Sequence, residues 1–155
     1  MVTNNTHDSF PKAFPGTFTQ FSPTWVRVAY GLFTLWFALL GAHMLIDPVG
    51  WYSATPGVSN EGPMNDHFIR DIGAAFVMVA IAYAFSLQKG ASWQLPAVAA
   101  VLPALHGAIH LFSAITGHSH GTAMVVELFG VILPGGIAVT LPIIHFRHQI
   151  KGGMR

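Results

Sequence analysis

The sequence lacks cysteine and has few charged residues, and each shortage excludes a class of protein. Without cysteine there can be no disulfide, thiolate metal site or iron–sulfur ligation. Only 8% of the 155 residues are charged, against about 25% in an ordinary soluble domain. The net charge of +1 comes from scattered Lys and Arg, so nucleic-acid binding is not expected. Any bound metal would have to use His, carboxylate or Met ligands.

The sequence is rich in long apolar stretches, and 52% of its residues are hydrophobic. Four stretches are each long enough to cross a hydrocarbon core of about 30 Å as a helix. Lipid offers the backbone no hydrogen-bond partners, so each span must be helical. We therefore expect an all-α fold, an integral membrane four-helix bundle over residues 25–146. The predicted spans are 25–46, 67–87, 93–117 and 123–146.

The basic residues predict the orientation of these spans. Six of the seven lie in segments that fall on one side of the membrane: Lys12, Arg27, Lys89, Arg147, Lys151 and Arg155. Because Lys and Arg concentrate in cytoplasmic segments, we expect an N-terminal arm (1–24) and a basic tail (147–155) in the cytoplasm. The expected location is a bacterial inner membrane, with lipid as the surrounding partner. Arg70 is the exception, because it lies inside the second span.

Ionisable residues from all four spans fall at one predicted depth. At about 1.5 Å per helical residue, they lie roughly 7 to 10 Å from the membrane centre, on the outer side. These residues are His43, Arg70, Asp71, His110 and Glu127, with Asp47, His67 and His106 one helical turn away. A charge inside a membrane costs several kcal/mol unless it pairs, binds a ligand or meets water. We therefore expect these side chains to converge inside the bundle.

One interpretation of this layer is structural. Arg70 would pair with Asp71, Glu127 or Asp47, and the histidines, His67 included, would bridge the helices by hydrogen bonds. The layer would then hold the helices in register.

The second interpretation is a metal site. His106 and His110, four residues apart, present two imidazoles on one helix face, and His43, Glu127 or Asp71 could complete the ligands of Zn, Cu or Fe. A quinone site, a haem site or a proton pathway is a third possibility. Away from this layer, His145 and His148 are expected among lipid headgroups.

A sequence motif in the second span carries a family resemblance. The pattern formed by Asn65, His67, Arg70, Asp71 and Gly73 resembles the hallmark segment of a family of small four-helix bacterial membrane proteins, distantly similar to DoxX-like proteins. The family also tends to have a histidine pair on its third helix, matched here by His106 and His110. The resemblance implies a four-helix bundle and, through DoxX-like relatives, partnership with a quinone-linked redox complex.

Two functions follow as expectations. The first is a non-catalytic accessory subunit of a larger membrane complex, or a homo-oligomer, because the N-terminal arm carries Phe10, Phe14, Phe18 and Phe21 and needs a surface to cover them. The second is a small membrane protein that binds a metal or redox cofactor through the His and carboxylate layer. No catalytic residues are assigned, since no nucleophile with its base and no phosphate loop is present.

Overall fold

The computed structural model describes residues 22–118 and 121–153, and all regular structure in this part of the chain is helical. The elements are α1 (Thr24–Ile46), α2 (Pro48–Ala54), η1 (Val58–Asn60), α3 (Asp66–Phe85), α4 (Gln94–Ala99), α5 (Val101–Ile115), α6 (Gly121–Glu127), the π-helical turn η2 (Leu128–Ile132) and α7 (Leu133–Gly153). The N-terminal arm lies outside the described residues, apart from 22–24 at its end.

Four helical stretches are long and apolar enough to cross a membrane, which confirms the all-α fold and the number of predicted spans. They are Thr24–Ile46, Asp66–Phe85, Gln94–Ile115 and Gly121–Lys151. The third and fourth are composite, since α4 joins α5 and α6 continues through η2 into α7. The last helix runs to Gly153, so most of the predicted tail is helical.

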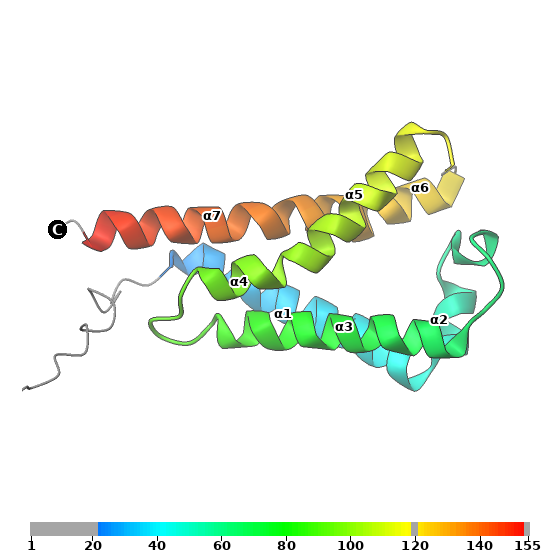
Figure 1. The fold of residues 1–155 in the computed structure, drawn as a ribbon, viewed down its shortest axis with the longest axis horizontal. Coiled ribbons are helices and arrows are strands. Elements are labelled where there is room, and N and C mark those ends of the chain that lie inside the picture. Colours follow the sequence, from blue (N-terminus) through cyan, green and yellow to red (C-terminus); the bar gives the residue numbers. More distant parts are fainter. Residues whose placement is uncertain (1–21, 119–120, 154–155) are drawn as a thin grey trace, which may run out of the picture.

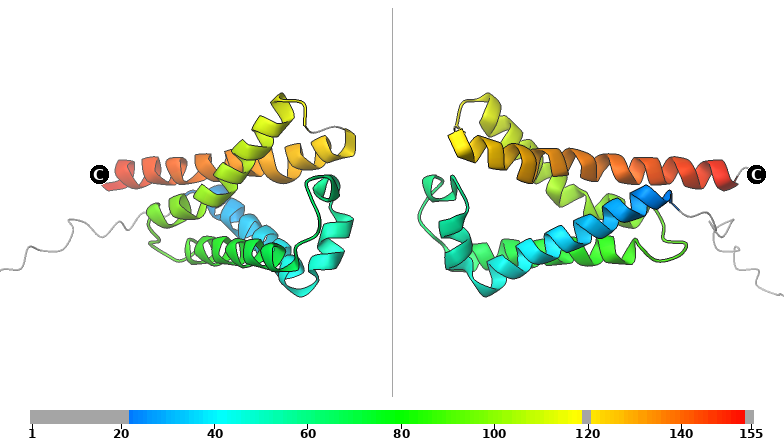
Figure 2. Two further views of the ribbon diagram at one scale, coloured as in Figure 1. Left: turned by 45° about the vertical axis from the view of Figure 1, so that its right-hand side comes forward. Right: turned by 180° about the vertical axis from the view of Figure 1, so that it is seen from behind.

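The helices form two pairs. α1 packs along α3, and α5 packs along α7 (Figure 1). Figures 1 and 2 show that α1 starts beside α7 and diverges from it toward α2. The two pairs are therefore close at the end where α4 lies, which we call the α4 end, and further apart at the other, the α2/α6 end. The start of α1 and the end of α7 both lie at the α4 end.

Glycine allows the close approach within each pair. A Cβ atom added to Gly41 on α1 would lie 2.6 Å from the Gly73 carbonyl oxygen on α3. In the second pair, a Cβ on Gly135 of α7 would lie 2.6 Å from the carbonyl oxygen of Pro103 on α5. Small residues at helix crossings bring backbones together and increase van der Waals contact, which is what drives helix association in lipid.

Proline explains the breaks in the third and fourth spans. Pro103 has no N–H for the Ala99 carbonyl, and its ring clashes with that group, so α4 ends at Ala99. Pro134 follows the π-helical turn, where the N–H of Leu133 bonds to the Leu128 carbonyl, five residues earlier.

A column of aromatic rings fills the core. Tyr30 stacks on Tyr83 with ring centroids 5.6 Å apart, and Phe37 stacks on Phe76 at the same distance. Phe76 then meets the edge of His106 at 6.0 Å. The column leads from the α4 end to the candidate site.

Candidate functional site

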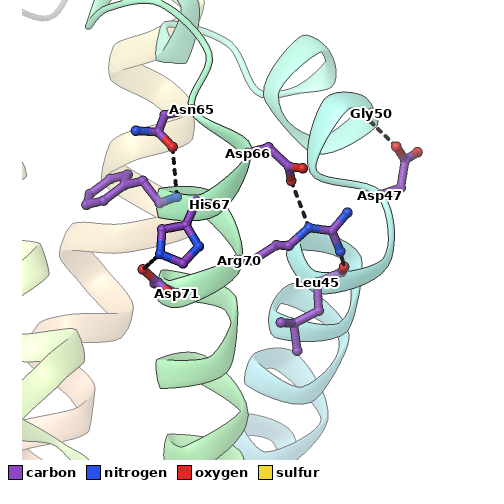
Figure 3. A network of polar contacts seen from close by, with 9 residues as sticks. Leu45, Asp47, Gly50, Asn65, Asp66, His67, Arg70 and Asp71 are labelled. Atoms are coloured by element: carbon purple, nitrogen blue, oxygen red, sulfur yellow. Dashed lines mark hydrogen bonds and ion pairs between the residues drawn. The ribbon is translucent and has the colours of Figure 1, made fainter.

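The predicted polar layer separates into two groups, and the first lies on the exposed start of α3 (Figure 3). Asn65 caps this helix, since its side-chain oxygen accepts a hydrogen bond from the Phe68 amide at 3.0 Å. His67 and Asp71 form an ion pair of 3.5 Å one turn apart, with side chains 90% and 61% exposed. Such exposed pairs contribute little to stability.

Arg70 is held by a carboxylate, as expected, but the partner differs from the prediction. Its Nε donates to Asp66 Oδ1 at 2.8 Å, one turn back on the same helix, and its Nη1 donates to the Leu45 carbonyl at the end of α1 (Figure 3). Asp47, a predicted partner, instead caps α2 by accepting from the Gly50 amide at 2.9 Å. Arg70 thus links α3 to α1 through a carbonyl that has no helical partner.

The second group lies on the other helix pair and is less exposed. The rings of His106 and His110 meet edge to face, with centroids 4.6 Å apart. His110 Nδ1 lies 3.6 Å from Oε1 of Glu127 on α6, and these two side chains are 29% and 15% exposed. This group brings together three of the five predicted metal ligands.

The five predicted metal ligands do not assemble into a metal site. Across residues 22–118 and 121–153, no three His, Asp or Glu side chains are arranged to hold a metal ion. Asp71 pairs with His67 on the exposed start of α3, and His43 is exposed on α1. Equal depth in the bundle did not bring these side chains to one point, because the helices present them in different directions.

A pocket between the two helix pairs adjoins His106. Its volume is about 240 Å³. Aromatic side chains from three helices form much of its wall, and its hydrogen-bonding side chains are His106, Thr55 and the indoles of Trp36 and Trp51. The lining residues are Trp36, Phe37, Leu40, Trp51, Thr55, Phe76, Pro103, His106, Val126, Gly130, Val131 and Pro134.

The π-helical turn shapes this part of the molecule. It begins directly after Glu127, and its Gly130 and Val131 line the pocket. A π-helical turn accommodates one extra residue, which rotates the helix before it relative to the helix after it. The turn therefore sets the direction in which α6 presents Glu127 to His110.

A second buried cluster, at the α4 end, was not expected from the sequence. His145 is 1% exposed, and its Nδ1 lies 3.4 Å from the hydroxyl of Tyr30, so the expectation that it lies among headgroups is wrong. The neighbouring Tyr83 is fully buried. One signal could have revealed this position: Ala138, Leu141, His145 and Gln149 recur at helical spacing and are all buried.

A groove also follows the outside of the second helix pair. It lies between α5 and α7, has a volume of about 510 Å³, and five of its eleven lining residues are alanine or glycine. Among them are Ala104, Gly107, Ala108, Gly135 and Gly136. No side chain in its lining is charged.

We compared the chain with protein-family models, curated proteins and solved structures, and none of them matched. The resemblance to DoxX-like proteins therefore stays a prediction.

Proposed function

We propose that this protein binds a small lipophilic molecule with a planar ring, inside the membrane, in the pocket between its two helix pairs. The observation that carries the proposal is the pocket itself, which combines aromatic walls with one imidazole, that of His106. Ligand sites have this composition, a mostly apolar lining with a few polar groups that fix orientation. Such a ligand corresponds to the organic redox cofactor expected from the sequence rather than to the metal ion.

The surroundings of the pocket suit a ligand delivered from lipid. A second groove, lined by Leu32, Leu35, Leu39 and Phe129 among others, shares Trp36 and Pro134 with the pocket. Leu32 and Phe129 are 64% and 65% exposed on this surface. A molecule dissolved in the hydrocarbon core could reach the pocket between α1 and η2 without crossing water.

The orientation of the protein is part of the proposal. Both ends of the described chain lie at the α4 end, and the basic residues predict that this end faces the cytoplasm of a bacterial inner membrane. The pocket and its His and carboxylate group then lie in the outer half of the membrane.

Tryptophan fluorescence tests the proposal directly. Trp36 and Trp51 line the pocket, so replacing Trp25 and Trp93 with Phe leaves these two as reporters. We expect thymol methyl ether, a small neutral ring, to change this fluorescence saturably in protein-loaded nanodiscs and not in empty ones. Calorimetry on the same samples would give the affinity.

Two glycines provide a matched pair of variants for this experiment. Gly130 lines the pocket, and a Cβ there would have no atom nearer than 4.0 Å, so Gly130→Leu should fill the space and abolish binding. Gly31 also has open space around it but lies outside the pocket, so Gly31→Leu should bind normally. Equal binding by both variants would contradict the proposal.

The groove between α5 and α7 favours a second candidate function, that of an accessory subunit or homo-oligomer. Small residues along a lipid-exposed helix pair suit the close approach of another transmembrane helix. Gly136 lines the groove with open space around it, so Gly136→Leu should weaken association, measured by cross-linking in native membranes.

Deletion of residues 1–20 tests the contribution of the aromatic arm in the same cross-linking assay. Cross-linking unchanged by both would argue against this candidate.

A further inference from the structure

We infer that the ring bound in this pocket carries a hydroxyl group, so that the ligand belongs to the phenols or hydroquinones. The inference rests on the proposed function and adds a chemical class to it. It follows from the hydrogen-bonding capacity of the two side chains in the pocket wall that can accept a hydrogen bond, Thr55 and His106. The indole N–H groups of Trp36 and Trp51 can only donate, and a hydroxyl oxygen can accept from them.

Thr55 can only accept a hydrogen bond from a ligand. Its hydroxyl lies at the end of α2 and donates its single hydrogen to the Trp51 carbonyl at 2.8 Å. A hydroxyl oxygen has two further lone pairs, and those of Thr55 remain for the pocket. A ligand that satisfies this oxygen must therefore bring a hydrogen-bond donor.

His106 can serve the same ligand. Within residues 22–118 and 121–153, its imidazole packs against the rings of Phe76 and His110 and makes no hydrogen bond. A neutral imidazole has one nitrogen that donates and one that accepts. It can take the hydrogen of a hydroxyl group or give one to its oxygen.

The rest of the wall excludes charged ligands. The lining contains no Lys, Arg, Asp or Glu, so a carboxylate or ammonium group would lose its hydration without gaining an opposite charge. A hydroxyl on an aromatic ring provides a donor at low desolvation cost and keeps the molecule neutral. The faces of Trp36, Phe37, Trp51 and Phe76 supply apolar contact for the ring.

The size of the pocket limits the ligand to a single substituted ring. About 240 Å³ lies below the range of roughly 300 to 1,000 Å³ usual for sites that enclose drug-sized molecules. A longer apolar chain on the ring would have to extend into the adjoining groove beside Leu32 and Leu39.

A pair of probes that differ only in the hydroxyl hydrogen tests the inference. Thymol is a phenol, and thymol methyl ether has the same ring without the donor. We expect wild-type protein in nanodiscs to bind thymol about tenfold more tightly than the ether, after correction for partition into empty nanodiscs. Tryptophan fluorescence and calorimetry provide the two affinities.

Variants then assign the preference to the two side chains. Thr55→Val keeps the shape and removes the acceptor, so it should lower thymol affinity several-fold and leave the affinity for the ether unchanged. Thr55→Ser should restore the preference. His106→Phe should likewise reduce the preference for thymol while retaining binding of the ether.

The outcomes separate the inference from the function on which it rests. Equal affinity of wild-type protein for the two probes would overturn the hydroxyl preference and leave the ring-binding function standing. If Thr55→Val and His106→Phe both still bind thymol more tightly than the ether, the hydroxyl preference does not arise from these two side chains, and its assignment to this pocket is overturned. Failure of both probes to bind saturably would overturn the proposed function itself.

Discussion

At the residue scale, two clusters of polar side chains, one half-buried and one buried, lie at the two ends of the molecule. His106, His110 and Glu127 lie beside the pocket, whereas Tyr30 and His145 lie at the α4 end. His110 of α5 lies beside Glu127 of the next helix, α6, whereas His145 of α7 lies beside Tyr30 of α1. In a hydrocarbon surrounding, losing a polar partner is costly because no water takes its place.

We predict that Glu127→Gln lowers the free energy of unfolding by about 1 to 3 kcal/mol, because the substitution removes a carboxyl group that is 15% exposed and lies 3.6 Å from His110 Nδ1. Thermal unfolding in detergent micelles would measure the change. Glu61→Gln is the control, since Glu61 is exposed in the loop before α3. Equal melting temperatures for the two variants would show that the Glu127 carboxylate has no structural role.

The histidines near the C-terminus allow a second matched comparison. His145→Ala should cost about 2 to 4 kcal/mol, because it opens a void at a side chain that is 1% exposed and removes the partner of the Tyr30 hydroxyl. His148→Ala, on the exposed face of the same helix, should change stability by less than about 0.5 kcal/mol. Similar losses in the two variants would contradict the observed burial.

At the scale of elements, each helix pair has a close backbone contact at glycine. Gly41 meets Gly73 between α1 and α3, and Gly135 meets Pro103 between α5 and α7. These contacts fix the distance between the paired helices, and they leave the distance between the pairs to the larger aromatic side chains. The pocket lies in this second, wider interface.

Adjacent glycines on α7 test the importance of the close contact. Gly135→Ala should destabilise the protein by about 1 to 3 kcal/mol, because the new methyl group would lie 2.6 Å from the Pro103 carbonyl oxygen and the helices would have to separate. Gly136→Ala meets nothing within 4 Å and should be neutral or slightly stabilising. Unfolding in detergent would compare them. A reversed order would show that the pair tolerates a wider spacing.

The elements were more predictable from the sequence than the site. The lengths of the apolar stretches predict all four spans, because lipid forces each stretch to be helical over about 30 Å. Pro103 and Pro134, in the middle of the third and fourth spans, indicate a kink in each, and both helices are irregular beside these prolines. The form of each irregularity, a break at Ala100 and a π-helical turn, was not predicted. Depth along a helix places His43 and His110 at one level, but it does not give the direction in which either points. The pairing of Glu127 with His110, and the isolation of His43, follow from those directions.

At the scale of the whole molecule, apolar side chains cover the outside as well as the core. Leu32, Val98 and Ile115 are 64%, 71% and 74% exposed, which in water would be unfavourable for a chain of this size. Together with four spans of membrane length, this surface indicates a multi-pass membrane protein. The charged residues of the α3 start form an exposed rim at the α2/α6 end.

Topology reporters test the proposed orientation. A reporter fused after Arg155 should give the signal of a cytoplasmic location. A reporter inserted at the exposed Ser59 should give the signal of a location outside the cytoplasm. The reason is the concentration of Lys and Arg in segments at the α4 end. The reverse result for both fusions would invert the orientation and place the pocket in the inner half of the membrane.

The pairing of helices that are close in the sequence makes the molecule two consecutive hairpins joined by one short connection. A side chain from each hairpin donates a hydrogen bond to this connection between α3 and α4. Arg27 of α1 donates to the Leu87 carbonyl at 3.2 Å, and Gln149 of α7 donates to the Ala91 carbonyl at 3.0 Å. Each hairpin has its own glycine contact, so its two helices can pack together without the other hairpin. The pocket is lined by both hairpins, so it exists only when they are packed together. If the two hairpins were synthesised as separate chains, the pocket would form when they associate in a bilayer.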